Sequence, residues 1–260
     1  MRGDEPSATY VYCIVRSARA PRLVKAPKGL AGTSKPRLLD AGDGLHLVVS
    51  TAPLSRYDGA VIDEKLRDLD WVGARASEHE AIVEHALELG TVVPMKLFTL
   101  FSSDERALAH VKKIRRSLER ITDRIAGCEE WGLRILFVDA RAARAAAETA
   151  RAASVVSGKD FLLRKKALGD ERRSAGARGT EAANALFDEL SALARSARRR
   201  PAPNRELAGR VLLDAVFLFP RAAVRRVKKA VAATAEAIIE EGCDVTLTGP
   251  WPAYSFIGEP

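Results

Sequence analysis

Residues 246–256 read TLTGPWPAYSF, in which a strand-like run leads directly into two prolines and three aromatic residues. Because proline fixes its own φ angle, the segment is predicted to be rigid and extended. Trp251, Tyr254 and Phe256 are large apolar groups that stabilise a protein when they are buried. We expect the segment to fold back on the body of the protein, and an exposed docking peptide is the alternative.

The composition is typical of a folded protein, with 47% hydrophobic and 29% charged residues in 260. This length suits one large domain or two ordinary ones. The strongest apolar run, VLLDAVFLF at 211–219, contains Asp214 and meets Pro220, so it is too short to cross a bilayer. The N-terminus has charges of both signs and no apolar core of signal-peptide length. We therefore expect a cytoplasmic protein without a membrane partner.

Residues with reactive side chains form no recognisable catalytic pattern. Cys13, Cys128 and Cys243 are far apart and form no CxxC pair, which favours free thiols. His79 and His85 are separated by about 240° around a helix, whereas a zincin helix needs histidines four positions apart. The sequence contains neither a phosphate-binding loop nor a nucleophile elbow. We predict no enzyme activity, no catalytic or metal-binding residue, no cofactor and no small-molecule substrate.

The carboxylates next to His79 support one minor alternative. Glu80 and Glu84 are one helical turn apart and could share a face, as an acid–base pair would. Two exposed carboxylates on a helix are more often solvated surface. An enzyme that uses them is therefore the least favoured reading.

The formal charge of +8 is concentrated in one region of the chain. Between positions 141 and 200 there are 14 Lys or Arg against 7 Asp or Glu, interleaved with alanine. This pattern is typical of solvated helix faces and of surfaces that dock acidic proteins. Single-strand binders stack bases on aromatic rings, and Phe161 and Phe187 are the only aromatic residues here. Docking of a protein is favoured, with a basic nucleic-acid-binding module as the alternative.

Apolar patterning predicts strands that alternate with helices. Strands are expected at 9–15, 91–101, 129–139, 209–218 and 243–250, with a hairpin around Gly42–Gly44. Helices are expected at 60–69, from Ser77 with a capping box to Glu80, at 102–127 and at 221–241. Two Ala-rich helices are expected within 141–200, followed by an exposed linker at 197–206. Gly169, Gly176 and Gly179 weaken the second helix and are candidate positions for a local loop.

These elements predict an α+β protein of two domains, residues 1–128 and residues 129–260. The boundary follows the helix that Gly127 ends. In the second domain, the element order resembles a modified ferredoxin-like fold with long Ala-rich helices. The C-terminal segment is counted with this second domain.

The segment TLTGPWPAYSF resembles the C-terminal signature of the gas vesicle proteins GvpL and GvpF, a strand that ends in Gly-Pro-Trp-Pro-x-Tyr-Ser-Phe. Further blocks resemble the family in the same order: YVYCIV, PLSRY, SEHEAIVEHAL, EEWGLRI and SGKDFLLRKK. The resemblance therefore covers nearly the whole chain. It implies signature, interdomain or partner-contact roles for Gly249, Pro250, Trp251, Pro252, Tyr254, Phe256, Trp131, His79 and Glu80.

One block departs from the family pattern. The family tends to read Pro-x-Arg-Phe-Gly-Thr where this chain has Lys96, Leu97 and Phe98. Loss of the glycine puts a special backbone dihedral at this position in doubt. Ala253 also stands where a proline is often seen, which is a mild change.

The resemblance implies a non-enzymatic accessory or assembly protein, a minor structural component located at the gas vesicle in the cytoplasm. Its expected partners are the hydrophobic shell protein and other gas vesicle accessory proteins, with no nucleic acid. The resemblance does not separate the L branch from the F branch. We expect the C-terminal segment to clamp the two domains in one orientation, where Trp131 or Trp71 could meet it.

Overall fold

The computed structural model describes residues 5–138, 158–201 and 209–258. Contacts divide the chain into two compact units, residues 1–127 with 251–260 and residues 128–250. The chain therefore passes between the units twice, after Gly127 and after Pro250. The predicted boundary near residue 128 lies beside the first crossing. The C-terminal segment, however, groups with the first unit, whereas the sequence placed it in the second.

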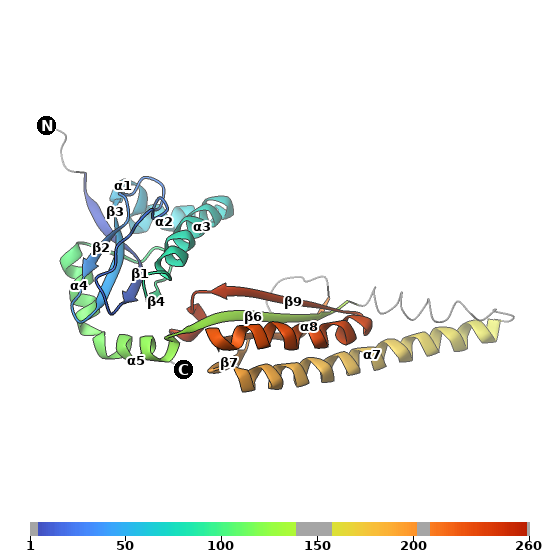
Figure 1. The fold of residues 1–260 in the computed structure, drawn as a ribbon. Helices are drawn as coiled ribbons and strands as arrows, with labels where there is room; N and C mark the ends of the chain where they lie inside the picture. Colours follow the sequence, from blue (N-terminus) through green and yellow to red (C-terminus); the bar gives the residue numbers. More distant parts are fainter. Residues whose placement is uncertain (1–4, 139–157, 202–208, 259–260) are drawn as a thin grey trace. The chain divides into compact units, whose positions relative to one another are not determined.

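The first unit is built on one antiparallel sheet with helices on both sides (Figure 1). Its strands follow the order β2-β3-β1-β4, and β5 also pairs with β1. They are β1 (Ser7–Arg16), β2 (Arg37–Asp40), β3 (Leu45–Pro53), β4 (Thr91–Pro94) and β5 (Leu100–Phe101). The helices are α1 (Leu54–Tyr57), α2 (Gly59–Lys65), α3 (Leu69–Ala86), α4 (Asp104–Lys113) and α5 (Arg115–Ile125), and the 3-10 turn is η2 (Tyr254–Phe256).

Strand β1, which includes the strand predicted at 9–15, lies between β3 and β4 in this sheet. Successive side chains of a strand point to opposite faces. Accordingly, the Thr9 hydroxyl donates to Asp104 of α4 at 2.7 Å. The next residue, Tyr10, places its hydroxyl 2.7 Å from Nδ1 of His79 on α3. The one strand thus holds a helix against each face of the sheet.

Helix α3 begins well before the expected start at Ser77. Its N-cap is Asp68, whose carboxylate accepts the Trp71 N–H at 3.0 Å. Ser77 lies inside the helix, where its hydroxyl donates to the Gly73 carbonyl at 3.0 Å. The predicted capping box of Ser77 and Glu80 is wrong because the earlier aspartate cap already satisfies the first turn.

The helix expected over 102–127 is two helices, α4 and α5. Ile114 separates them with φ −98° and ψ 11°, outside the α-helical range. The apolar stripe continues across the break, with Val111 and Leu118 both buried, so periodicity alone could not locate it. Gly127 follows α5 with φ 66°, the left-handed conformation for which glycine is suited.

The second unit has a four-stranded sheet in the order β7-β8-β6-β9. Its strands are β6 (Cys128–Phe137), β7 (Ser196–Arg199), β8 (Arg210–Pro220) and β9 (Cys243–Trp251). Its helices are α7 (Gly158–Leu193) and α8 (Val224–Glu240), the latter preceded by η1 (Arg221–Ala223). Strand β7 occupies the region predicted as helix end and linker. The first Ala-rich stretch, through residue 157, and positions 202–208 of the linker lie outside the described residues.

Helix α7 runs without a break through Gly169, Gly176 and Gly179, so the predicted local loop is wrong. Three glycines cost about 1 kcal/mol each in helix propensity. Tertiary packing outweighs this cost, since Leu186 and Leu190 are buried in the core of the unit. Gly179 also allows close approach, because a Cβ there would lie 2.9 Å from the Cys243 sulfur.

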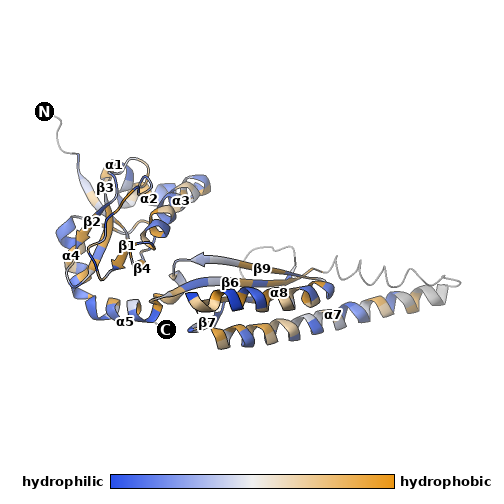
Figure 2. Ribbon diagram, in the orientation of Figure 1, coloured by the Kyte–Doolittle hydropathy of each residue, from blue (hydrophilic) through white to orange (hydrophobic). Residues whose placement is uncertain are grey.

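Alternate residues of β6 and β8 form the core of the second unit with α7 and α8. Figure 2 shows hydrophilic and hydrophobic residues in succession along α8, as expected for an amphipathic helix. The core includes Trp131, Leu133, Ile135 and Phe137 of β6, Leu213, Ala215, Phe217 and Phe219 of β8, and Val227 and Val231 of α8.

Asp214, which interrupts the apolar run of β8, faces away from this core. It is 4% exposed, and its carboxylate accepts from Arg134 at 2.7 Å and from Arg200 at 2.7 Å. Arg134 is also its cross-strand partner on β6. A buried carboxylate is costly without such partners, so these ion pairs tie β6 and the end of β7 to β8.

Phe98 keeps the backbone conformation that the family's glycine would favour. Its φ is 64°, a conformation that costs a non-glycine residue about 1–2 kcal/mol. The Phe98 ring stacks on Trp71, with centroids 5.3 Å apart and planes inclined by 18°. Its N–H donates to the Tyr10 hydroxyl at 3.2 Å. The special dihedral is therefore present, and side-chain stacking replaces the freedom of glycine.

We predict that Phe98→Ala destabilises the first unit more than Phe98→Gly does. Alanine removes the stacking and keeps the strained φ, whereas glycine recovers about 1 kcal/mol of that strain. Urea unfolding followed by tryptophan fluorescence measures both free energies. Equal or greater stability of the alanine variant would contradict the strain argument.

Candidate functional site

The residues singled out by the sequence fall into two groups. Glu80 and Tyr254 meet in the first unit, next to His79. Gly249 and Trp131 meet in the second unit. Pro250, Trp251 and Pro252 form the link between the two groups, so the C-terminal signature spans the second crossing of the chain.

Gly249 lies near the end of β9, at a position where no side chain fits. Its φ is 140°, and a Cβ at this position would lie 2.8 Å from the Trp131 ring and 2.9 Å from the Glu130 carbonyl oxygen. The peptide bond from Gly249 to Pro250 is cis. Trp131 is 4% exposed, and the Lys228 ammonium lies 5.0 Å from its ring centroid. The glycine of the signature is thus required by both its backbone angle and the indole beside it.

The segment after Pro250 is anchored at two points of the first unit. The Tyr254 hydroxyl donates to Oε2 of Glu80 at 2.7 Å. A guanidinium nitrogen of Arg124, on α5, donates to the Phe256 carbonyl at 2.6 Å. Phe256 is 1% exposed, whereas Trp251 and Tyr254 remain 43% and 37% exposed. Phe256 is therefore part of the core, whereas Trp251 and Tyr254 keep part of their surface in solvent.

Glu80 has an unusual environment for a carboxylate. Burial raises its pKa, the Tyr254 hydrogen bond lowers it, and the neighbouring Glu84 carboxylate raises it. Its second oxygen, Oε1, is buried and makes no hydrogen bond to the part of the chain that the structure describes. The Tyr254 hydroxyl is thus the principal group that compensates the buried end of this side chain. Burial also raises the pKa of Tyr254, so it remains a donor at neutral pH.

His79 is locked into a buried hydrogen-bond chain. It is 3% exposed, and burial lowers its pKa to about 4, so its ring is neutral at pH 7. Nδ1 can then accept the proton of the Tyr10 hydroxyl, whose oxygen in turn accepts the Phe98 N–H. Nε2 is also buried, and a hydrogen bond from the ring to the Met95 backbone raises the pKa slightly against the larger effect of burial. The chain joins α3, β1 and the turn before β5.

This arrangement is suited to holding structure. His79 is buried and hydrogen-bonded to Tyr10, and Glu80 accepts a hydrogen bond from Tyr254. Among residues 5–138, 158–201 and 209–258, no three His, Cys, Asp or Glu side chains gather as metal ligands. Nor does any helix of these ranges have the length and apolarity needed to cross a membrane.

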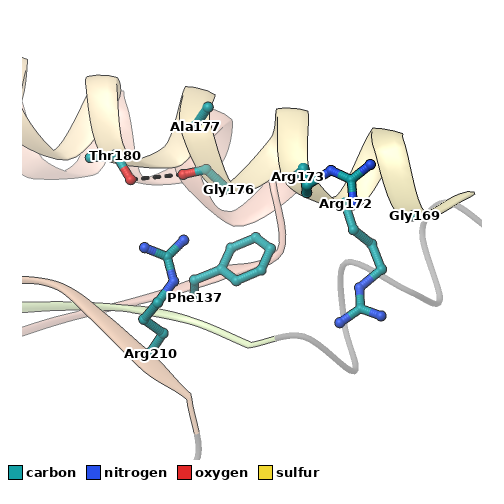
Figure 3. A pocket seen from close by; sticks show the side chains of 8 residues that line it. All are labelled: Phe137, Gly169, Arg172, Arg173, Gly176, Ala177, Thr180 and Arg210. Atoms are coloured by element: carbon teal, nitrogen blue, oxygen red, sulfur yellow. Dashed lines mark hydrogen bonds between the residues drawn. The ribbon is translucent and has the colours of Figure 1, made fainter.

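Two cavities lie away from the signature residues. One, of about 600 Å3 in the first unit, has an aromatic and aliphatic lining that includes Tyr57, Ile62, Phe98 and Phe101. The other, of about 510 Å3 in the second unit, is lined by arginines and small residues of α7 together with Phe137 and Arg210 (Figure 3).

A sequence model of the family described as gas vesicle synthesis protein GvpL/GvpF matches residues 8–258. The chain belongs to the GvpL/GvpF family. The family resemblance drawn from the signature and its collinear blocks is thereby confirmed.

Relatives and solved structures agree with this assignment. Gas vesicle protein L of Streptomyces sp. is 29% identical over 252 residues, which cover 96% of this chain and 92% of the relative. Gas vesicle protein L2 of Halobacterium salinarum is 25% identical, over 98% of this chain and 93% of the relative.

Crystal structures of GvpF from Anabaena sp. PCC7120 and Microcystis aeruginosa have the same fold. The first aligns with a TM-score of 0.68 at 16% identity, covering 98% of this chain and 97% of the other. The second aligns with a TM-score of 0.66 at 15% identity, covering 97% and 99%. The α+β fold class is confirmed at this level.

The sequence did not predict the contacts of some residues that hold the GvpL/GvpF fold of this chain together. Tyr10 looked like an ordinary strand residue, and only its contacts identify it as the link between His79 and Phe98. No sequence pattern indicated that Arg124 has a role, because its partner is the backbone carbonyl of Phe256, far along the chain. Phe98 was noted as the residue that replaces a family glycine, but the positive φ that it keeps was not expected.

We predict that Tyr254→Phe lowers the free energy of unfolding of the first unit by about 1 kcal/mol. The substitution removes one hydrogen bond to a half-buried carboxylate and leaves the shape of the ring. In a Glu80→Ala background the same substitution should have little effect, because its acceptor is gone. Chemical unfolding of the four proteins measures this coupling. Additive effects of the two changes would show that the hydrogen bond contributes nothing.

We predict that His79 makes the first unit less stable in acid. Its pKa of about 4 in the folded state lies below the ordinary value of 6.5, so unfolding takes up a proton between these pH values. The contribution of His79 to the free energy of unfolding is fully present above pH 6.5. It is lost as the pH falls toward 4, by about 1.4 kcal/mol per pH unit.

The control is His79→Gln, which retains an acceptor for Tyr10 and does not titrate. Glu80, whose pKa is raised, contributes in the opposite direction in both proteins and cancels in the comparison. Between pH 6.5 and pH 5, the free energy of unfolding should therefore fall by roughly 2 kcal/mol more in the wild type than in the variant. A constant difference would contradict a neutral buried imidazole.

Proposed function

We propose that this chain is a non-enzymatic accessory protein of gas vesicle formation, located at the gas vesicle in the cytoplasm. The observation that carries the proposal is the family match over residues 8–258, which includes both units and the C-terminal signature. The names of the two relatives, gas vesicle protein L and L2, support the same role. One of the two candidate acid–base carboxylates, Glu80, accepts a hydrogen bond from Tyr254, and this supports a non-enzymatic role.

The proposed partners are the hydrophobic shell protein and other accessory proteins. An assembly factor for an apolar subunit needs a surface that shields apolar groups for a limited time. The cavity of about 600 Å3 beside β5 supports such a role, because Tyr57, Phe98 and Phe101 contribute to its lining. Asp58 and Asp63 also line it, so apolar and polar groups of a bound segment both find partners.

We also propose that the second unit is a modified ferredoxin-like domain. The order of elements, β6-α7-β7-β8-α8-β9, supports this, as does the strand order β7-β8-β6-β9. The length of α7, residues 158–193, is the modification.

We further propose that the C-terminal signature maintains the arrangement of the two domains, with a partner contact as the second possibility. Its anchors on Glu80 and Arg124, together with the fit of Gly249 against Trp131, support this role. Trp71, the other candidate neighbour, stacks on Phe98.

The test is deletion and tagging in a host that forms gas vesicles with this protein. We expect deletion to reduce vesicle yield strongly, as counted by electron microscopy, and the wild-type gene to restore it. An affinity-tagged chain should retain the shell protein and other gas vesicle proteins from lysates of vesicle-forming cells. Normal yield after deletion, together with no gas vesicle protein retained by the tag, would overturn the proposal.

A further inference from the structure

The basic cavity of the second unit lies where α7 continues past the end of the sheet. Phe137 at the end of β6 and Arg210 at the start of β8 are cross-strand partners and form one wall. The opposite wall is α7, and Figure 3 shows its residues above Phe137 and Arg210. Gly169, Arg172, Arg173, Gly176, Ala177 and Thr180 line the cavity from this helix, at spacings that place them on one face.

Two glycines of α7 create the space. Gly169 has no atom within 4 Å of where a Cβ would stand, so it faces open volume. At Gly176 a Cβ would lie 3.0 Å from an Arg210 guanidinium nitrogen and 3.7 Å from the Phe137 ring. Each glycine costs about 1 kcal/mol in the middle of a helix. The helix thus keeps two weak positions directly over the cavity.

The lining of the cavity carries an excess of positive charge. Three arginines contribute to it, and no carboxylate of the residues that the structure describes does. Arg173 forms an ion pair with Asp170, one helical turn away. The Arg210 guanidinium lies 5.5 Å from the centroid of the Phe137 ring, and no described carboxylate forms an ion pair with it. A guanidinium supported on an aromatic ring is positioned to receive a carboxylate through paired N–H donors.

We propose that this cavity binds a carboxylate side chain in an acidic segment of a partner protein. The inference rests on the proposed function, because it assigns one of the protein contacts that an accessory role requires. Sites for phosphate usually combine a cation with free backbone N–H groups at a helix N-terminus. Here Gly176 lies in the interior of α7, where backbone N–H groups are used within the helix, so the donors are planar guanidinium groups.

The experiment measures binding of a fluorescein-labelled hexaglutamate peptide to the full chain by fluorescence anisotropy, with labelled hexaserine as the neutral comparison. Arg210→Gln should weaken hexaglutamate binding about tenfold, the size expected for a lost charge-assisted hydrogen bond. Arg226→Gln is the matched control, since it removes the same charge from an exposed position on α8. It should change the affinity by less than about twofold.

Gly169→Met separates the cavity from general charge. It fills open volume without altering any arginine, and it improves helix propensity, so the protein should remain folded. We expect it to weaken hexaglutamate binding about as much as Arg210→Gln does. Circular dichroism of each variant checks that the helices are retained.

Three results would overturn the inference. Equal weakening by Arg226→Gln would mean that net charge alone attracts the peptide. Unchanged binding by Gly169→Met would place the peptide outside the cavity. Displacement of hexaglutamate by an equimolar amount of inorganic phosphate would make this a phosphate site.

The proposed function is tested separately. If deletion of the gene lowers vesicle yield and the Arg210→Gln and Gly169→Met variants restore it fully, the proposed function stands. This cavity then has no part in that function. Yield that is independent of the gene would remove the accessory role itself.

Discussion

The Tyr10 hydroxyl is the point on which the first unit depends. It is fully buried, and it joins the neutral imidazole of His79 to the backbone N–H of Phe98. A buried hydroxyl without partners would destabilise the fold, so strand, helix and turn must come together for any of them to be satisfied. The strained φ of Phe98 is tolerated because this hydrogen bond and the Trp71 ring both hold the turn.

Helix α3 also links the core of the first unit to the C-terminal segment. His79 and Glu80 are neighbours on α3, yet one faces the buried hydrogen-bond chain and the other receives Tyr254. The histidine-glutamate pair of the family block therefore has a structural role in this chain. A pair that resembles part of a metal or acid–base motif is used to position a strand on one side and a terminal segment on the other.

In the second unit, packing outweighs local preference. Helix α7 passes through three glycines because its C-terminal half is buried against β6 and β8, and hydrophobic burial exceeds the loss of propensity. Asp214 is accommodated in an apolar strand for a related reason. The alternation of a strand directs it away from the core, toward the two arginines that neutralise it.

The amino-acid sequence by itself determined the α+β class, most strands, the free cysteines and the family, because these depend on residue type and short-range pattern. Helix limits were less accessible: the apolar stripe crosses the break at Ile114, and Ser77 has the residue types of a cap inside a longer helix. The grouping of the C-terminal segment with the first unit, the meeting of Tyr254 with Glu80, and the arginine-lined cavity were decided only by the tertiary structure. They depend on contacts between residues far apart in the chain, and no local pattern records which of many buried or charged side chains will meet.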